Sequence, residues 1–247
     1  MQKEAKPSSH QQLGWTFITQ QRVIAVLSFF LPLFLIGWSI LSGQGIRGSI
    51  SEYYYTPVRD VFVGTLSALA LFLWSYRGYH PTNPELRADR VVAKIASVAA
   101  ALTALAPLKP RGADWSCTLL QCVVGVDITY WIHNIAAAVF LTALAVFCLI
   151  LFPMSAIPNR DMGRNLVIYG VSGATMIIAV LLMVLWTFLP VEIYFMLGKY
   201  KPILFLETVA LMAFATSWLL RSSAVEHAAL ARYRPAEEIA QSEPSPH

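Results

Sequence analysis

The stretch VIAVLSFFLPLFLIGWSIL, from Val23 to Leu41, decides the fold of this chain. It carries no charged residue, and about 20 consecutive apolar residues in a helix cross the hydrocarbon core of a bilayer, which is roughly 30 Å thick. Five further segments are similarly apolar: Asp60–Tyr76, Val91–Leu108, Ile128–Phe152, Leu166–Pro190 and Pro202–Leu220. An isolated span satisfies its backbone hydrogen bonds in lipid only as a helix. The sequence therefore predicts an all-α fold, a polytopic six-helix transmembrane bundle.

The composition agrees with a membrane protein and argues against a soluble one. Hydrophobic residues make up 57% of the chain and charged residues 13%, with a mean hydropathy of +0.58. Soluble globular domains have roughly half apolar and a quarter charged residues. The sequence pI is about 9.0, but the basic residues are spread over short loops and do not form one stripe. We therefore expect no nucleic-acid partner.

The distribution of Lys and Arg predicts the orientation of the bundle. Twelve of these residues fall on one side: Lys3, Lys6, Arg22, Arg77, Arg87, Arg90, Lys94, Arg160, Arg164, Arg221, Arg232 and Arg234. Six fall on the other: Arg47, Arg59, Lys109, Arg111, Lys199 and Lys201. The richer side is cytoplasmic by the positive-inside rule. Both termini are expected in the cytoplasm, and the protein is expected to be a multi-pass protein of the inner (cytoplasmic) membrane.

Three segments follow from this topology. Residues 1–21 are expected to form a cytoplasmic N-terminal lead, 22–221 the six-span domain, and 222–247 a cytoplasmic helical extension with a disordered tail. The first span is longer than the apolar region of a signal peptide, so we interpret it as a retained anchor.

The cysteines allow two interpretations. Cys117 and Cys122 lie in the longest outer loop, where an oxidising compartment permits either a disulfide or free thiols. Cys148 lies within the fourth span, where a buried cysteine behaves as a small apolar residue.

Polar residues gather toward one leaflet. The stretch GSISEYYYTPVRDVFVG, Gly48 to Gly64, precedes and opens the second span. The second, fourth and sixth spans run inward from the outer side, so residues early in each lie near that surface. Ionisable residues at membrane depth are costly and indicate a functional site. The candidate ligand-binding residues are Glu52, Tyr53, Tyr54, Tyr55, Arg59, Asp60, His133 and Glu207.

Two packing expectations accompany this site. Asp60 and Gly64, with Ser67 and Ala68, fall on one face of the second span, and small residues permit close helix packing, so this face is predicted to point inward. His133 is predicted to pair with Glu207.

Each feature also has a structural interpretation. The three tyrosines are typical of the aromatic belt at a membrane surface. Thr56 and Pro57 read as an N-cap and first helical position, where the helix dipole favours Asp60. A bond between His133 and Glu207 would equally serve to join two helices, since pairing offsets the cost of burying polar groups.

Several stretches carry a resemblance to a known family. SISEYYYTPVRDVFVG, LWSYRGY, YWIHNIAAAVFLTALAVFCLI and LFLETVALMAFATSWLL together resemble the bacterial membrane proteins classed as domain of unknown function 998, over about Arg22 to Leu220. The six-span plan is also distantly similar to eukaryotic membrane proteins of the DRAM/Frag type. That likeness maps Ser51, Glu52, His133 and Glu207 onto motif positions, and it implies an association with membrane lipid.

These observations predict an uncharacterised membrane protein with an outward-facing polar site that binds or handles a lipid or small amphiphile. No cofactor and no metal are assigned, and the oligomeric state is left open. One alternative is a metal-dependent membrane hydrolase acting on lipid: Glu52, Asp60, His133 and Glu207 offer oxygen and nitrogen ligands. The other is a small-solute transporter, although no inverted repeat is evident. Whether the chain is an enzyme is therefore open.

Overall fold

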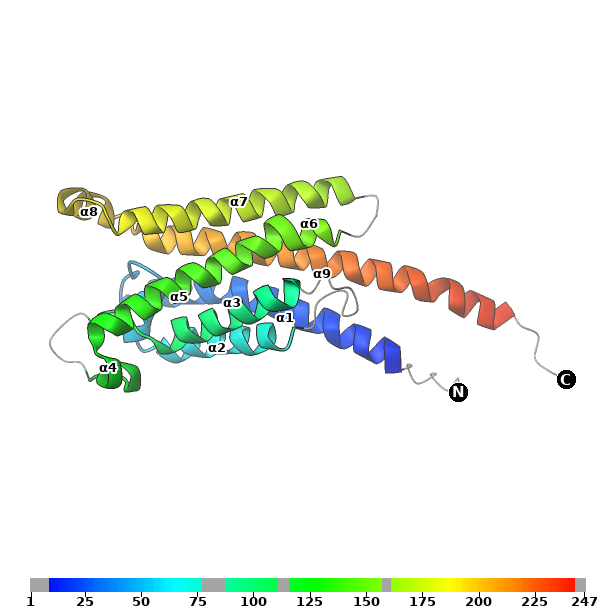
Figure 1. The fold of residues 1–247 in the computed structure, drawn as a ribbon, viewed down its shortest axis with the longest axis horizontal. Coiled ribbons are helices and arrows are strands. Elements are labelled where there is room, and N and C mark those ends of the chain that lie inside the picture. Colours follow the sequence, from blue (N-terminus) through cyan, green and yellow to red (C-terminus); the bar gives the residue numbers. More distant parts are fainter. Residues whose placement is uncertain (1–8, 77–87, 111–115, 157–160, 243–247) are drawn as a thin grey trace.

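The structure is a computed structural model that describes residues 9–76, 88–110, 116–156 and 161–242, with side chains described between 18 and 227 (Figure 1). Every regular element in these ranges is helical, which confirms the all-α prediction. The main helices are α1 (Ser9–Ser42), α2 (Arg59–Trp74), α3 (Ala88–Leu105), α5 (Val126–Val146), α7 (Met162–Trp186) and α9 (Pro202–Ser242). Shorter elements are the 3-10 helix η1 (Ser51–Tyr55), α4 (Leu119–Val124), the π-helical turn η3 (Phe147–Leu151), α6 (Phe152–Met154) and α8 (Val191–Gly198).

Each of the six predicted apolar segments lies on one of the main helices, the fourth continuing from α5 through η3 into α6. Four helical stretches are long and apolar enough to cross a membrane: Ile18–Ser42, Val126–Met154, Met162–Trp186 and Pro202–His227. α2 has 16 residues, and α3 has 18 but includes Asp89, Arg90 and Lys94. The structure thus supports a membrane protein with four candidate spans among its described helices.

The main helices form a closed ring in chain order. Each contacts the next, and α9 packs against α1 to close the ring. Figure 1 shows neighbouring helices running in opposite directions, with the beginning of α1 and the end of α9 at one end of the bundle. α4 and α8 lie at the other end, where α2, α5 and α9 begin. We call this the α4–α8 end.

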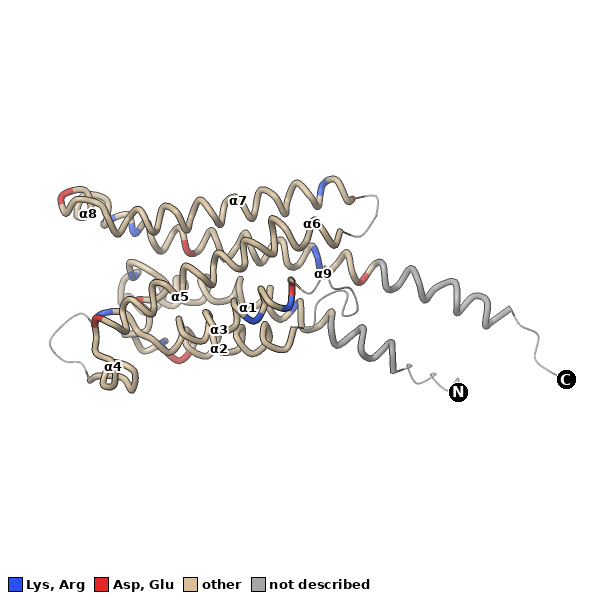
Figure 2. The backbone as a smooth tube through the Cα atoms, in the orientation of Figure 1, with Lys and Arg blue, Asp and Glu red and all other residues tan. Residues whose placement is uncertain are grey.

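Charged residues gather toward the two ends of the ring, as Figure 2 shows. Asp127 and Glu192 lie in the first turns of α5 and α8 at the α4–α8 end, and Asp89 and Arg164 lie in the first turns of α3 and α7, which begin at the other end. The long middle is apolar, and many of its large side chains are exposed on the outside of the bundle, as expected of helices that face lipid.

A cluster of aromatic side chains fills the ring toward the end opposite α4 and α8. Trp218 lies at its centre and contacts four rings, with centroids 5.0 to 5.7 Å away: Tyr76, Phe147, Phe152 and Phe214. Arg221 lies one turn further along α9, is only 2% exposed, and donates to the Ser155 hydroxyl at 2.9 Å. α9 continues past Arg221.

The prediction for the inner face of the second span was also wrong. Asp60 and Gly64 are exposed, whereas Phe62, Leu66 and Leu69 are buried. Bulky apolar side chains remove more surface from the surroundings than small ones, so they set the orientation of α2. α7 packs closely at Gly173, where an added Cβ would overlap the Leu149 side chain.

Some predictions concern residues outside the described ranges. These include Lys3, Lys6, Arg77, Arg87, Arg111 and Arg160, which contribute to the predicted orientation. α9 extends to Ser242, further than the predicted helical extension, and residues 243–247 lie beyond the described part of the chain.

Candidate functional site

A cavity of about 870 Å³ opens at the α4–α8 end, between α5, α7 and α9. The loop before η1 and the short helix α8 cover it. Its polar lining comprises Arg47, Ser49, Ser51, Glu52, Lys109, His133, Asn134, Lys199, Lys201 and Glu207. Its apolar wall includes Leu141, Val180, Met183, Trp186 and Phe195. Leu141 lies roughly 22 Å along α5 from the first residue of that helix, so the cavity reaches deep into the ring.

The loop before η1 is attached to the first turns of α9. The backbone N–H of Ile50 donates to the Glu207 carboxylate at 2.5 Å, and the N–H of Leu204 donates to the Gly48 carbonyl at 3.0 Å. Neither N–H group has a partner within regular secondary structure: Ile50 lies in a loop, and Leu204 lies in the first turn of a helix. Each therefore needs another acceptor when it is buried. The bonds fix the loop across the mouth of the cavity.

A second set of bonds shapes the loop itself. Glu52 accepts from the N–H of Gly48 at 2.9 Å, and its own N–H donates to the Ser49 hydroxyl at 3.1 Å. A Cβ on Gly48 would lie 2.9 Å from a Glu52 carboxylate oxygen. A side chain at this position would therefore displace the Glu52 carboxylate from the Gly48 N–H.

His133 connects the loop to the ring. Its Nδ1 lies 2.6 Å from the Ala106 carbonyl just after α3, and its Nε2 lies 2.8 Å from the Ser51 hydroxyl. A carbonyl oxygen only accepts, so Nδ1 carries a proton. In the neutral ring Nε2 is then the acceptor, and the Ser51 hydroxyl donates to it. The side chain is 2% exposed, so this bonding pattern is shielded from bulk water.

The predicted pair of His133 and Glu207 does not form. Both ring nitrogens of His133 have other partners, and Glu207 accepts from Ile50. The two side chains line the same cavity and bind adjacent residues of one loop. The loop therefore lies between them.

The three tyrosines lie outside the cavity lining and hold η1 in place. Tyr53 is fully buried, with its hydroxyl 2.7 Å from that of Ser39 on α1. Tyr54 packs edge-on against Phe62, and the Arg59 guanidinium lies over its ring at 5.0 Å from the centroid. Arg59 and Asp60 are exposed on α2, and neither lines the cavity.

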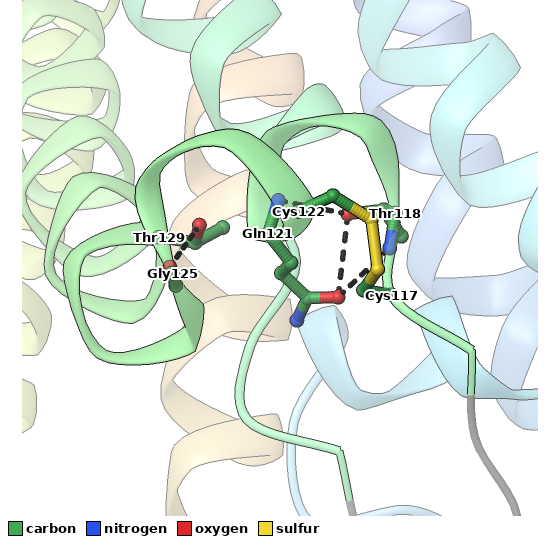
Figure 3. Close-up of a disulfide and its surroundings, with 6 residues drawn as sticks. All are labelled: Cys117, Thr118, Gln121, Cys122, Gly125 and Thr129. Atoms are coloured by element: carbon green, nitrogen blue, oxygen red, sulfur yellow. Dashed lines mark hydrogen bonds between the residues drawn. A yellow bond between two sulfur atoms is a disulfide. The ribbon is translucent and has the colours of Figure 1, made fainter.

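Tyr55 links η1 to the disulfide-bonded helix α4. Partial burial raises the pKa of Tyr55, so its hydroxyl is protonated at neutral pH and donates to the Leu108 carbonyl at 2.6 Å. The same hydroxyl accepts from the Gln121 side-chain amide at 2.9 Å. Figure 3 shows Gln121 within the capping box with Thr118, between Cys117 and Cys122. These two cysteines form a disulfide, with Cα atoms 5.5 Å apart, and Cys148 is free and buried.

Three of the cations that the sequence predicts on the outer side line the cavity: Arg47, Lys199 and Lys201. The buried Nε atom of Arg47 has no hydrogen-bond partner among the described residues. Lys201 has a φ of 53°, in the left-handed region that side chains other than glycine rarely adopt. Such strained positions cluster at functional sites, and this one was not visible in the sequence.

A fourth cation, Lys109, is already paired. Its ammonium lies 2.6 Å from the Asp127 carboxylate, and this hydrogen bond raises the pKa of Lys109. Lys109 also lies over the Tyr130 ring, at 5.2 Å from the centroid. The free positive charge of the lining therefore resides on Arg47, Lys199 and Lys201.

The four residues considered for a metal site do not all line the cavity. Glu52, His133 and Glu207 line the cavity, but Asp60 does not. Within the described ranges, no group of three or more His, Cys, Asp or Glu side chains has an arrangement that could hold a metal ion.

Comparisons with known proteins found no relative of this chain. No family model matches the chain, and neither a curated protein nor a solved structure matches it.

Proposed function

We propose that this protein is a six-span protein of the bacterial inner membrane that binds an anionic amphiphile, such as a phosphate-bearing lipid, in the cavity at the α4–α8 end. Both termini are cytoplasmic in this proposal, and the cavity faces outward. α2 and α3 complete the ring beside the four candidate spans, which supports their crossing the membrane as well. The resemblance to the bacterial family of domain of unknown function 998 points the same way.

The observation that carries this proposal is the division of the cavity into a cationic mouth and an apolar wall. Arg47, Lys199 and Lys201 stand at the mouth, and the wall extends to Leu141 and Val180. An amphiphile has the same division, with a charged headgroup and an apolar chain. Arg and Lys are the side chains that recognise phosphate oxygens.

The bonding of the acids favours an anionic ligand over an amine. Glu52 and Glu207 already accept from the backbone of the covering loop. The three cations have no ion-pair partner among the described side chains, and an unpaired guanidinium that is partly buried costs free energy until an anion binds it.

The surroundings of α8 support entry from the membrane. Phe188, Phe195 and Met196 are 77%, 75% and 60% exposed, and no residue of α8 is buried. Large exposed apolar side chains beside a cavity are typical of a surface that meets lipid. Phe195 also lines the cavity, so α8 contributes both to the cavity and to the exposed apolar surface beside it.

A transport function receives less support. Among the described residues, the aromatic cluster around Trp218 fills the ring beyond the cavity, which argues against a wide path for a solute along the axis. We therefore favour a binding cavity that is closed toward the cytoplasm.

The test is a lipid analysis of protein purified from membranes in mild detergent. Wild type should retain close to one phosphate-bearing lipid per chain. Replacing both Arg47 and Lys201 by Gln should lower retention roughly tenfold or more, since each hydrogen bond to a charged group contributes about 1.5–3 kcal/mol. Arg164→Gln is the matched control, because Arg164 is exposed beside Asp161 in the first turn of α7, which begins at the opposite end of the bundle. Equal retention by all three proteins contradicts the proposal.

A further inference from the structure

Ser51 and His133 meet at the cavity in the arrangement of a nucleophile and its base. Nucleophilic catalysis by serine needs a base within about 2.6–3.2 Å of the hydroxyl and a third group that orients the base. The Ser51 Oγ to His133 Nε2 distance is 2.8 Å. The Ala106 carbonyl receives the Nδ1 proton at 2.6 Å and so fixes the tautomer in which Nε2 is the acceptor.

The fold holds this pair from three separate segments. Ser51 begins η1, His133 lies in the second turn of α5, and Ala106 follows the last residue of α3. Loop attachment alone does not require the pair, because Glu207 and Leu204 already bind the loop on either side of Ser49. Ser51 and His133 are only 6% and 2% exposed, and burying a hydroxyl and an imidazole costs free energy. A third attachment of the loop does not by itself explain that cost.

The pair is placed where an ester of an amphiphile would lie. Both side chains line the cavity, and His133 lies about two turns before Leu141 on α5, nearer the end where the cavity opens. A headgroup at Arg47 and Lys201 with an acyl chain toward Leu141 puts the bond that joins them between the two ends. Arg47, four positions before Ser51, has a buried Nε donor without a hydrogen-bond partner among the described residues. A donor of this kind stabilises the oxyanion that forms during attack on an ester.

We propose that Ser51 is the nucleophile and His133 the general base of a hydrolase that cleaves a carboxylic ester of the bound anionic amphiphile. This inference rests on the proposed binding function and adds turnover to it. Ala106 acts as a positioning residue through its carbonyl group.

The reaction has two balanced halves. Ser51 Oγ attacks the ester carbonyl carbon, its proton passes to His133 Nε2, and the carbon–alkoxy bond breaks as that proton moves to the departing alcohol. Water then attacks the acyl-serine, gives a proton to Nε2, and the proton returns to Ser51 Oγ as the acyl–Oγ bond breaks. An ester and water become a carboxylic acid and an alcohol, and neither is oxidised or reduced.

The test uses the full chain in vesicles of phosphatidylglycerol and phosphatidylethanolamine. A fluorophosphonate, which modifies activated serines, is applied, and the modified residue is located by peptide mass spectrometry. Fatty-acid release and lipid retention are measured on the same samples. Wild type should carry the adduct on Ser51 and release fatty acid. His133→Gln should retain lipid. It should lower the rates of adduct formation and of fatty-acid release roughly 100- to 10,000-fold, the usual contribution of a general base.

Two further variants complete the design. Ser51→Ala should retain lipid and lose both the adduct and the release. Ser75→Ala should behave as wild type, because Ser75 is exposed and follows the last residue of α2, whereas the cavity opens at the end where α2 begins. The wild-type result decides between the proposals even if a variant fails to fold. If wild type retains lipid but shows neither the Ser51 adduct nor fatty-acid release, the hydrolase proposal is overturned and the binding proposal stands. Absence of retained lipid, of the Ser51 adduct and of fatty-acid release in wild type overturns both proposals.

Discussion

The N–H of Ile50 donates a hydrogen bond of 2.5 Å to the carboxylate of Glu207, a residue 157 positions later in the chain. This bond joins the loop after α1 to the first turns of α9. Since α9 also packs against α1, the two ends of the chain close the ring and position the cavity together. The loop that carries Ser51 and Glu52 is therefore fixed by the same contact that closes the bundle.

Removal of the Glu207 acceptor should destabilise this loop. Glu207→Ala leaves the Ile50 amide without its partner, and an unsatisfied buried donor costs about 1–3 kcal/mol. Glu207→Gln keeps an oxygen that can accept the same hydrogen bond, so we expect its loss of stability to be clearly smaller than that of Glu207→Ala. Denaturant unfolding in detergent, followed by tryptophan fluorescence, compares the two. Equal loss by Ala and Gln would show that the charge, and not the acceptor, matters.

The glycine at position 48 should be needed for the Glu52 bond. In Gly48→Ala the new Cβ lies 2.9 Å from a Glu52 oxygen, so the carboxylate must leave the Gly48 amide. We expect a loss of about 1–2 kcal/mol in stability and weaker lipid retention. Gly64→Ala is the control: it has no atom within 4 Å of an added Cβ and lies inside α2, where alanine is favoured by roughly 0.5–1 kcal/mol. A neutral Gly48→Ala would count against the role given to Glu52.

The helices of this fold could be predicted because their signal is local. Uninterrupted apolar runs predict helices without knowledge of their neighbours, and the predicted segments fall on the six main helices. Alternating helix direction also placed Glu52, His133 and Glu207 at one end of the bundle, where all three line the cavity.

The remaining parts depend on contacts that local patterns do not encode. The orientation of α2 depends on which face has partners, and Phe62 and Leu66 outweigh the small residues beside Asp60. The partners of His133 come from a loop carbonyl and a loop hydroxyl, whose positions require the folded backbone. Lys201 shows the same limit, because its left-handed φ follows from the path of the chain between α8 and α9.

Gly173 should be intolerant of larger side chains. It faces the π-helical turn, and an added Cβ would overlap Leu149 and come within 3.1 Å of the Leu149 backbone nitrogen. Gly173→Ala should therefore cost about 1–3 kcal/mol through overpacking. Gly170→Ala lies one turn earlier on α7 with open space around the new methyl group, so it should lose no stability. Thermal unfolding of both variants in detergent tests this; similar melting temperatures would place the two glycines in equivalent surroundings.

The disulfide should stabilise α4 and, through Gln121, the Tyr55 hydroxyl. A bridge that closes a loop as short as Cys117–Cys122 contributes about 2 kcal/mol in the chain-entropy account. Replacing both cysteines by Ser should therefore speed hydrogen exchange in α4 and in η1, where Tyr55 ends the 3-10 helix. Exchange in α7, which does not pack closely against α4, serves as the internal reference. Unchanged protection of α4 would mean that its capping box is sufficient.

The backbone at Lys201 predicts a conflict between stability and binding. Its φ of 53° costs an L-residue roughly 1–2 kcal/mol, which glycine avoids. Lys201→Gly should therefore leave the protein equally or more stable, by up to about 1 kcal/mol, while lipid retention falls with the lost charge. Lys199 is the matched control, because it lines the same cavity with a helical φ of −58°. Lys199→Gly should lose stability by roughly 0.5–1 kcal/mol in addition to lipid. If Lys201→Gly is destabilised as much as Lys199→Gly, the strain at Lys201 is not relieved by glycine, and its position at the cavity mouth has another cause.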